Sequence, residues 1–206
     1  MTWFTRFTRF GEMHMVYSQE NSNSCGIACV RMVVFKVNKL RPHALALRSE
    51  QSIDADYARV SGAPYDGSGY SNATLLFKLL NQFTSDTWVA EYAGPAVIGQ
   101  KLIDSVGVNG TPGASTGAPV IVLVGWSAGG AHFVVVDSIN EVRGQHYASV
   151  CDPWDGNVHV TAFAPGQPFN YTGAPVPWSW SFGGPEHTYD GGPSSGAGNG
   201  WIIRKA

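Results

Sequence analysis

The chain contains 206 residues, which is enough for one domain with a substantial hydrophobic core. Its formal net charge at pH 7 is −2 and it has no lysine or arginine cluster, so neither charge nor pattern points to a nucleic-acid partner. Hydrophobic residues make up 44% of the chain, which excludes an intrinsically disordered protein. We expect residues 1–206 to form a single folded domain.

Nothing in the sequence indicates a membrane span or a cleaved targeting segment. The longest apolar run, residues 118–126, is far too short to cross a bilayer. The N-terminus MTWFTRFTRF has no continuous apolar stretch, so no cleaved secretory signal is expected, which leaves the cytoplasm or a signal-independent export route. Phe4, Phe7 and Phe10 recur every three residues and indicate an N-terminal arm over residues 1–16, either packed on the body or contacting a membrane surface or a partner.

The first half of the sequence carries mainly helical patterns. Ser24 is a suitable N-cap for a helix that begins at Cys25, and a leucine-rich face follows Ser71. The expected elements, in chain order, are helices over 25–34, within 42–59 and after residue 71, a strand over 87–93 and a helix over 96–106.

The second half has the pattern of β-strands. Short apolar segments separated by Gly, Asn and Asp turns predict strands over 120–124, 132–137, 147–151 and 158–163, with a closing strand at 201–203. Residues 164–200 are rich in Gly, Pro and aromatic residues and predict an ordered loop laid on the body. Helices first and an antiparallel sheet second indicate an α+β fold, with the N-terminal helices packed on the C-terminal sheet.

Two nucleophiles compete in this sequence, and the first is Ser127. Residues 125–129, GWSAG, match the G-x-S-x-G pattern of serine hydrolases. That motif needs a helix directly after the serine, whereas the β-branched run 132–136 follows here. We therefore expect Ser127 to lie in a Gly-rich hairpin loop without a catalytic role.

Cys25 is the stronger candidate. It follows a potential N-cap, at the end of the helix where the dipole stabilises a thiolate. Gly26 would let a substrate backbone approach closely. The side-chain amide of Gln19, six residues upstream, could join the backbone N–H of Cys25 as the second donor of an oxyanion hole.

A nucleophilic cysteine needs a base, and His132 is the best placed histidine. It begins a predicted strand, so its imidazole can project from the sheet towards the end of the helix. Asp152 ends the neighbouring strand ahead of Pro153, and antiparallel pairing would place it beside His132 to orient the ring. Asp137 is the rival orienter, but it lies five residues along the same strand, about 17 Å away at the rise of a strand.

Several further segments join these residues in a fixed order. They are Ser24-Cys25-Gly26-x-Ala28 after Gln19, Gly62-Ala-Pro-Tyr65 ahead of the leucine-rich helix, residues 119–124 and 132–136, and Cys151-Asp152-Pro153-x-x-Gly156. Over residues 17–160 this set resembles the papain-like cysteine peptidases of the bacteriocin-processing type. The resemblance implies a papain-like fold with Cys25 as nucleophile, His132 as base, Asp152 as orienter and Gln19 as oxyanion donor.

The implied activity is peptide-bond hydrolysis through a thiolate–imidazolium pair and an acyl-enzyme, on a peptide or protein substrate. The best-known members of the family are fused to ABC transporters, but this sequence contains no transporter segment, and residues 164–206 have no counterpart. A double-glycine leader substrate is therefore not implied, and an exported effector or toxin is an alternative setting. The same triad also serves deamidases, transglutaminases and amide-cleaving cell-wall enzymes, and a non-catalytic binding module could use the same fold.

No metal or organic cofactor is expected, and an activating or inhibiting protein partner is left open. Each candidate also has a plain interpretation: a buried helix cysteine for Cys25, a loop residue for Gln19, a strand-start residue for His132 and a turn opener for Asp152. Cys29 and Cys151 are expected in the core, and no matching pair supports a zinc site with Cys25 and Cys29. Trp126 and Trp154 are either a shield for the His–Asp pair or ordinary core residues. The remaining histidines show no ligand spacing and are assigned no role.

Overall fold

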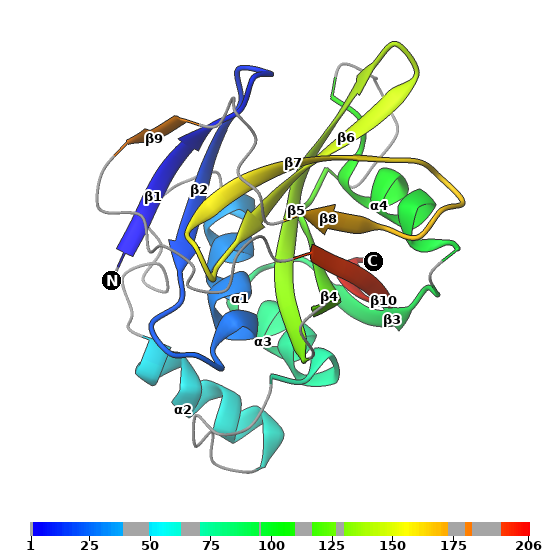
Figure 1. Cartoon of the computed structure of the whole chain (residues 1–206). Helices are drawn as coiled ribbons and strands as arrows, with labels where there is room; N and C mark the ends of the chain where they lie inside the picture. The colour runs from blue at the N-terminus through cyan, green and yellow to red at the C-terminus, as the bar shows by residue number, and fades with distance from the viewer. Residues whose placement is uncertain are drawn as a thin grey trace.

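The computed structural model describes residues 2–38, 50–62, 71–94, 96–109, 117–126, 130–172, 180–182 and 195–206. These residues form an α+β fold of four helices and antiparallel sheets (Figure 1). The helices are α1 (Cys25–Val37), α2 (Glu50–Ser61), α3 (Ala73–Phe83) and α4 (Ile98–Val106). The strands are β1 (Thr2–Phe7), β2 (Met13–Ser18), β3 (Trp88–Tyr92), β4 (Val120–Trp126), β5 (Ala131–Val142), β6 (Gln145–Asp152), β7 (Asn157–Phe163), β8 (Asn170–Thr172), β9 (Trp180–Phe182) and β10 (Ser195–Lys205). None of the helices within these ranges is long and apolar enough to cross a membrane.

A seven-stranded antiparallel sheet forms the centre of the molecule. Its strands follow the order β3-β10-β4-β5-β6-β7, and β8 pairs with β10 outside this path. Strands β4 to β7 are sequential antiparallel neighbours, whereas β10 lies between β3 and β4. The predicted closing strand at 201–203 is thus confirmed as part of β10, which occupies an interior position in the sheet.

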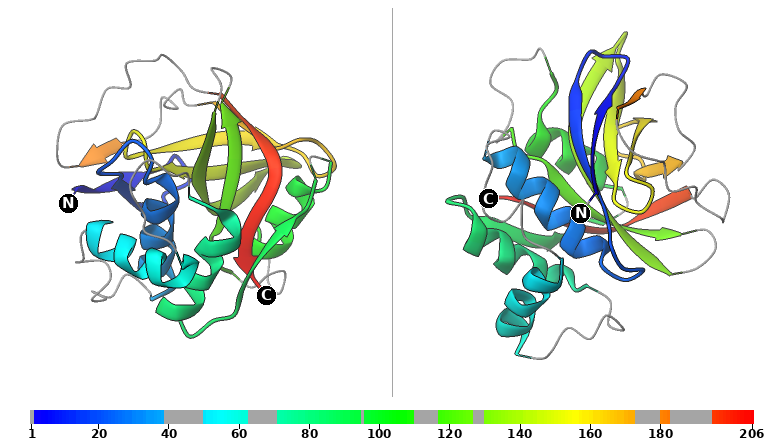
Figure 2. Two further views of the ribbon diagram at one scale, coloured as in Figure 1. Left: turned by 90° about the horizontal axis from the view of Figure 1, so that it is seen from below. Right: turned by 90° about the vertical axis from the view of Figure 1, so that its left-hand side faces the viewer.

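Both faces of the sheet are covered, which explains the nearly continuous apolar run in β5. Side chains such as Ile121, Phe133 and Val135 face a core shared with α1, α2 and α3. The alternate residues Val134 and Val136 face a second core beneath α4. Figure 2 shows α1 and α3 on one side of the strands and α4 on the other. A strand buried on both faces loses the polar–apolar alternation of a half-exposed strand.

The N-terminal arm is a β-hairpin packed on the body. Strands β1 and β2 pair antiparallel, and β9 adds to the other edge of β1. Phe4 is fully buried, and β2 packs against α1 and β6. The packed alternative for the arm is therefore confirmed, although the hairpin reaches Ser18 and so extends beyond the predicted end at residue 16.

The predicted elements of residues 25–163 are present, with shifted ends. The strand predicted over 132–137 continues to Val142, because a register shift between Val136 and Ser138 lets β5 keep pairing with β6 past Asp137. The helix predicted within 42–59 is described from Glu50 onwards as α2, and residues 39–49 lie outside the described part of the chain.

The prediction of a loop over residues 164–200 is wrong in three places. Residues 170–172, 180–182 and 195–200 are strands, while 173–179 and 183–194 lie outside the described residues. The Gly-rich start of β10 has a low intrinsic preference for strand structure, but β4 and β8 pair with it along its two edges. Tertiary pairing therefore overrides the local composition here.

Candidate active site

Helix α1 places Cys25 at its first position, where the sequence predicts it. Every residue of the helix from Cys25 to Val34 is buried against the sheet and the neighbouring helices, which fixes its N-terminal end. Ser24 occupies the N-cap position but makes no capping hydrogen bond. Its hydroxyl instead donates to the backbone oxygen of Asn21 at 2.9 Å and accepts from the backbone N–H of Asn21 at 3.2 Å. The expected serine cap is thus corrected: Ser24 stabilises the preceding turn.

Gly26 has a packing role that the sequence did not indicate. A β-carbon at this position would lie 2.4 Å from Cβ of Ser71 and 2.8 Å from Cδ1 of Leu76. The glycine lets α1 approach the start of α3, so the expectation that it serves substrate approach is replaced by a structural reason.

His132 and Asp152 form a buried pair on neighbouring strands. Nε2 of His132 lies 2.7 Å from Oδ1 of Asp152, and each side chain is 3% exposed. His132 sits near the start of β5 and Asp152 at the end of β6, as antiparallel pairing of the two predicted strands required. The prediction that these two side chains lie side by side is confirmed.

The imidazole of His132 also makes a side-chain hydrogen bond with Cys25. Because Nε2 contacts Asp152, Nδ1 is the ring nitrogen that remains for the thiol. Burial lowers the pKa of His132, but the negative charge of Asp152 and the contact with Cys25 outweigh this effect, and the pKa lies well above its ordinary value. Burial raises the pKa of Asp152, yet the charges of His132 and His159 leave it below the ordinary value. The structure therefore favours a charged imidazolium between two acidic groups.

Trp154 covers the His–Asp pair from the turn that follows β6. Its ring meets the imidazole of His132 edge-on, with 6.4 Å between ring centroids and 85° between ring planes. Its backbone N–H donates to Oδ1 of Asp152 at 2.8 Å. Trp154 thus holds the carboxylate and shields it from water, whereas the side chain of Trp126 lies outside the described part.

Gln19 lies in the loop before α1, but its amide nitrogen is directed at its own loop. Nε2 donates to the backbone oxygens of Asn21 at 2.7 Å and Ser22 at 3.1 Å. Both N–H groups are occupied in this conformation, so Gln19 does not supply the expected oxyanion donor here. Its backbone N–H donates to the oxygen of Pro153 at 2.8 Å, which ties the nucleophile loop to the turn after Asp152.

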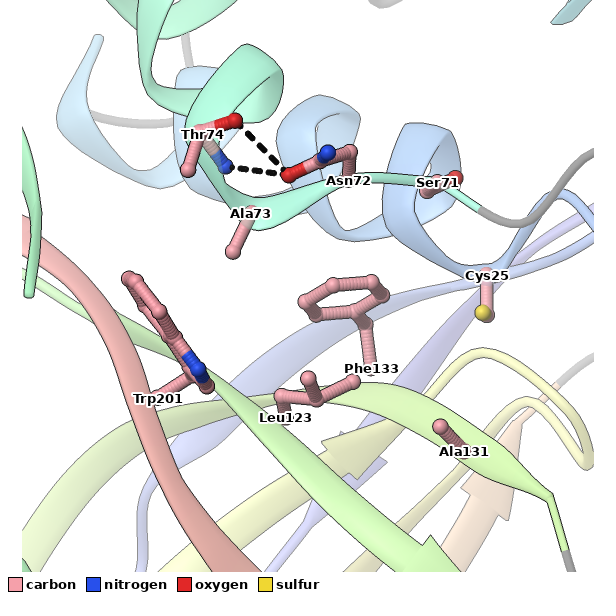
Figure 3. A pocket seen from close by; sticks show the side chains of 9 residues that line it. All are labelled: Cys25, Ser71, Asn72, Ala73, Thr74, Leu123, Ala131, Phe133 and Trp201. Carbon is pink, nitrogen blue, oxygen red and sulfur yellow. Dashed lines mark hydrogen bonds between the residues drawn. The ribbon is translucent and has the colours of Figure 1, made fainter. Parts of the chain in front are cut away.

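A cavity of about 570 Å³ opens beside Cys25. Cys25 lies at one end and Trp201 at the other, with Phe133 between them (Figure 3). Leu123 and Ala131 complete an apolar floor formed by β4 and β5, and the residues at the start of α3 form the facing wall. The cleft next to the thiol is therefore suited to an uncharged, apolar group.

Neither a family model nor a curated protein matches this chain in sequence. The function is therefore inferred from the contacts between Cys25, His132 and Asp152 and from the adjoining cleft.

The two alternative site residues, Ser127 as nucleophile and Asp137 as orienter of His132, are not supported by the structure. Ser127 lies outside the described residues, but β4 and β5 on either side of it are antiparallel neighbours, and a strand begins at Ala131 where a nucleophile elbow would need a helix. Asp137 contacts Nδ1 of His14 at 2.5 Å and Nζ of Lys36 at 3.1 Å. It belongs to another cluster and does not orient His132.

Two buried groups near the site were missed from the sequence. Glu50 is fully buried and accepts hydrogen bonds from the backbone N–H of Glu20 at 3.0 Å and from Nδ2 of Asn21 at 3.2 Å. It therefore fixes the loop that leads to Cys25. Burial raises its pKa, although hydrogen bonds from that loop oppose the shift. No local pattern signals this role, because an acidic residue at a helix start ordinarily interacts only with the helix dipole.

His159 and Asp155 form a second buried pair behind Asp152. Nε2 of His159 lies 2.8 Å from Oδ2 of Asp155, and donor atoms of Asp152, Asp155 and His159 all lie within 4.8 Å of one another. These three residues could reach one metal ion, but the carboxylate of Asp152 contacts His132 and that of Asp155 contacts His159. We therefore assign this pair to the support of Asp152.

Proposed function

We propose that this protein is a papain-like cysteine peptidase that hydrolyses peptide bonds through Cys25. The observation that carries the proposal is the buried contact of His132 with both Asp152 and Cys25, at the N-terminal end of α1. A cysteine nucleophile is activated by a base that contacts its thiol and is itself held by a carboxylate. A position at the N-terminal end of a helix stabilises the thiolate further.

The reaction proceeds in two halves. His132 holds the proton of the Cys25 thiol, and the thiolate attacks the carbonyl carbon of the substrate. The tetrahedral intermediate collapses when the imidazolium gives its proton to the leaving amine, and a thioester with Cys25 remains. His132 then takes a proton from water, the hydroxide attacks the thioester, and the carboxylic acid leaves while the sulfur departs as a thiolate beside the imidazolium.

The developing oxyanion needs donors, and the helix start supplies the first. As the first residue of α1, Cys25 has a backbone N–H without an acceptor inside the helix. Gln19 lies six residues before Cys25, and its side-chain amide would have to turn from the backbone oxygens of Asn21 and Ser22 to act as the second donor. We propose that substrate binding brings about this turn.

The cleft supports a preference for an apolar residue next to the scissile bond. The cavity beside Cys25 has Leu123, Phe133 and Trp201 on its surface and places no charged side chain among its described lining residues. Burying a large apolar side chain there stabilises the complex by about 1.5–3 kcal/mol, and a charged side chain would lose its hydration without a partner.

The test is incubation of the full chain with reduced, denatured casein and analysis of the products by mass spectrometry. We expect new peptide termini with wild-type protein, and none with Cys25→Ala. A matched Cys29→Ala variant should retain cleavage, because Cys29 is a fully buried residue one turn along α1. Ammonia release from intact casein would support a deamidase instead. The absence of both products with folded protein would contradict the proposal.

A further inference from the structure

A buried hydroxyl without a hydrogen bond lies on the wall of the cleft next to the thiol. Ser71 lines the same cavity as Cys25 and is only 8% exposed. Its Oγ is buried and has no hydrogen-bond partner among the described residues. Buried polar atoms in folded proteins nearly always have a partner, and an unpartnered one costs free energy. A hydroxyl of this kind on the wall of a cleft is a candidate contact for a ligand.

The residues that follow Ser71 on this wall satisfy one another. Asn72 is the N-cap of α3, and its Oδ1 accepts from the backbone N–H and from the hydroxyl of Thr74, each at 2.8 Å (Figure 3). The backbone N–H of Asn72 donates to the hydroxyl oxygen of Tyr57 at 3.0 Å. These contacts fix the start of α3 without the side chain of Ser71, so its hydroxyl is not needed to cap the helix.

Ser71 lies close to the candidate nucleophile. Figure 3 places it at the same end of the cavity as Cys25, away from Trp201. A β-carbon at position 26 would lie 2.6 Å from Oγ of Ser71, so the hydroxyl packs against the residue that follows Cys25. Serine has a single side-chain torsion, and rotation about it can redirect the hydroxyl towards a group bound in the cleft. The hydroxyl is therefore placed to meet the part of a substrate that adjoins the scissile bond.

An apolar cleft leaves the main chain of a bound peptide in need of hydrogen-bond partners. Each peptide residue brings an N–H and a C=O group, and both lose water when the adjoining side chain is buried. The floor of the cleft, formed by Leu123, Ala131 and Phe133, carries no polar side-chain atom. A serine hydroxyl can donate and accept, so it suits either main-chain group.

We propose that the hydroxyl of Ser71 binds the main chain of the substrate at the residue whose side chain enters the apolar cleft. This inference rests on the proposed peptidase function and adds a substrate contact to it. Ser71 holds the main chain, while Leu123, Phe133 and Trp201 receive the side chain. The hydroxyl takes no part in making or breaking bonds.

Removal of this hydroxyl should affect stability and recognition in different ways. Ser71→Ala keeps the β-carbon that packs against α1 and removes an atom that has no partner in the free protein. The variant should therefore be at least as stable as the wild type, whereas recognition of a peptide should weaken. A serine with a merely structural role would show a loss of stability instead.

The test compares two reagents that alkylate Cys25 in the full chain at one pH. Acetyl-Ala-Leu chloromethyl ketone carries a peptide main chain and an apolar side chain, and iodoacetamide carries neither. We expect Ser71→Ala to slow the peptide reagent by about 3- to 10-fold, the value of one hydrogen bond, and to leave the rate with iodoacetamide unchanged. The urea midpoint of Ser71→Ala should equal or exceed that of the wild type.

The matched control is Ser138→Ala, which removes a serine hydroxyl of similar burial that does have a partner. Ser138 is 7% exposed, and its Oγ donates to Oε2 of Glu12 at 2.7 Å. This variant should lower the urea midpoint and leave the rates with both reagents unchanged. Ser71→Gly, which also lacks the hydroxyl, replaces Ser71→Ala if the latter does not fold, with the same loss expected for the peptide reagent alone.

The possible outcomes separate this inference from the proposed function. Equal rates of the peptide reagent with wild type and folded Ser71→Ala would overturn the contact and leave the proposed function standing. A lower urea midpoint of Ser71→Ala, with both reagents slowed equally, would show a structural role and overturn it too. Slow reaction of wild-type Cys25 with both reagents would contradict the proposed function and the inference together.

Discussion

Nε2 of His132 lies 2.7 Å from Oδ1 of Asp152, and both side chains are almost fully buried between β5, β6 and the turn that carries Trp154. The two residues are 20 positions apart in sequence and meet because their strands are antiparallel neighbours. This contact fixes the orientation of the ring and leaves Nδ1 as the ring nitrogen available to Cys25. Asp152 can act on His132 in two ways, by orienting its ring and by its negative charge. Asp152→Asn separates the two, because asparagine keeps an oxygen that can orient the ring and removes the charge.

The first prediction concerns the two contributions of Asp152. Asp152→Ala removes both the acceptor and the charge, and we expect it to lower kcat/KM on casein-derived peptides by about 100-fold, within the range for general acid–base groups. Asp152→Asn keeps an oxygen that can accept from Nε2 of His132, so about a tenfold loss is expected. Steady-state kinetics on both variants checks this order. Equal losses would contradict an orienting role.

The same pair predicts how the free energy of unfolding depends on pH. Burial raises the pKa of Asp152, but His132 lowers it by more, so the folded-state pKa lies below the ordinary value. The stabilisation that the Asp152 carboxylate adds to the free energy of unfolding is therefore present above about pH 4 and is lost as the pH falls through the folded-state pKa. Burial lowers the pKa of His132, but Asp152 raises it by more, so the folded-state pKa lies above the ordinary value. The stabilisation that the imidazolium adds to the free energy of unfolding is therefore complete below about pH 6.5 and is lost as the pH rises through the folded-state pKa.

Wild-type protein should therefore exceed Asp152→Asn in stability most strongly between about pH 4 and 6.5. The difference is expected to be about 3–5 kcal/mol there, because the variant leaves a buried imidazolium without its partner. Urea unfolding over a pH series measures it. A difference that does not change from pH 4 to pH 9 would show that the two groups are not an ion pair.

A third prediction tests the close approach of α1 and α3. Gly26→Ala should destabilise the fold by about 1–3 kcal/mol, since the new β-carbon overlaps Ser71 and Leu76. The control is the double variant Gly26→Ala/Ser71→Gly, which removes the atoms that are contacted most closely and should recover part of the loss. Guanidinium unfolding of the set gives the coupling energy. Equal or greater stability of Gly26→Ala than of wild type would contradict the packing role.

The cleft next to Cys25 gives a prediction about specificity. Trp201→Ala removes the apolar end of the cavity, and kcat/KM should fall about tenfold for peptides with Phe or Leu next to the scissile bond. Peptides with Lys or Asp at that position should change much less. Val142→Ala, a substitution at an exposed residue remote in β5, is the control. Equal effects on both kinds of peptide would show that Trp201 does not contact that side chain.

The sequence was sufficient to predict the parts of the site that depend on local patterns. The helix at Cys25, the strands around His132 and Asp152, and their side-by-side placement follow from periodicity and from antiparallel pairing. The papain-like fold, the peptidase activity and the catalytic roles stay predictions.

The roles of several buried residues could not be predicted from the sequence, because these roles depend on contacts between segments that are distant in the chain. The carboxylate of Glu50 reaches the loop before Cys25 only because α2 packs beside it. His14 and Cys151 meet because the N-terminal hairpin packs on β6. Gly26 looked like a residue for substrate approach because its neighbour in space, Ser71, is 45 positions away in sequence. Such pairs have no spacing rule that a single sequence reveals.

The most direct test of the central claim is the rate of iodoacetamide alkylation at Cys25 as a function of pH, read by peptide mass mapping. His132→Ala serves as the comparison. In a thiolate–imidazolium pair the sulfur stays reactive well below the pH at which a free thiol loses its proton. For such a pair we expect fast modification of Cys25 near pH 5–6 in the wild type and its loss in His132→Ala. Modification that is slow until the alkaline range in both proteins would contradict it.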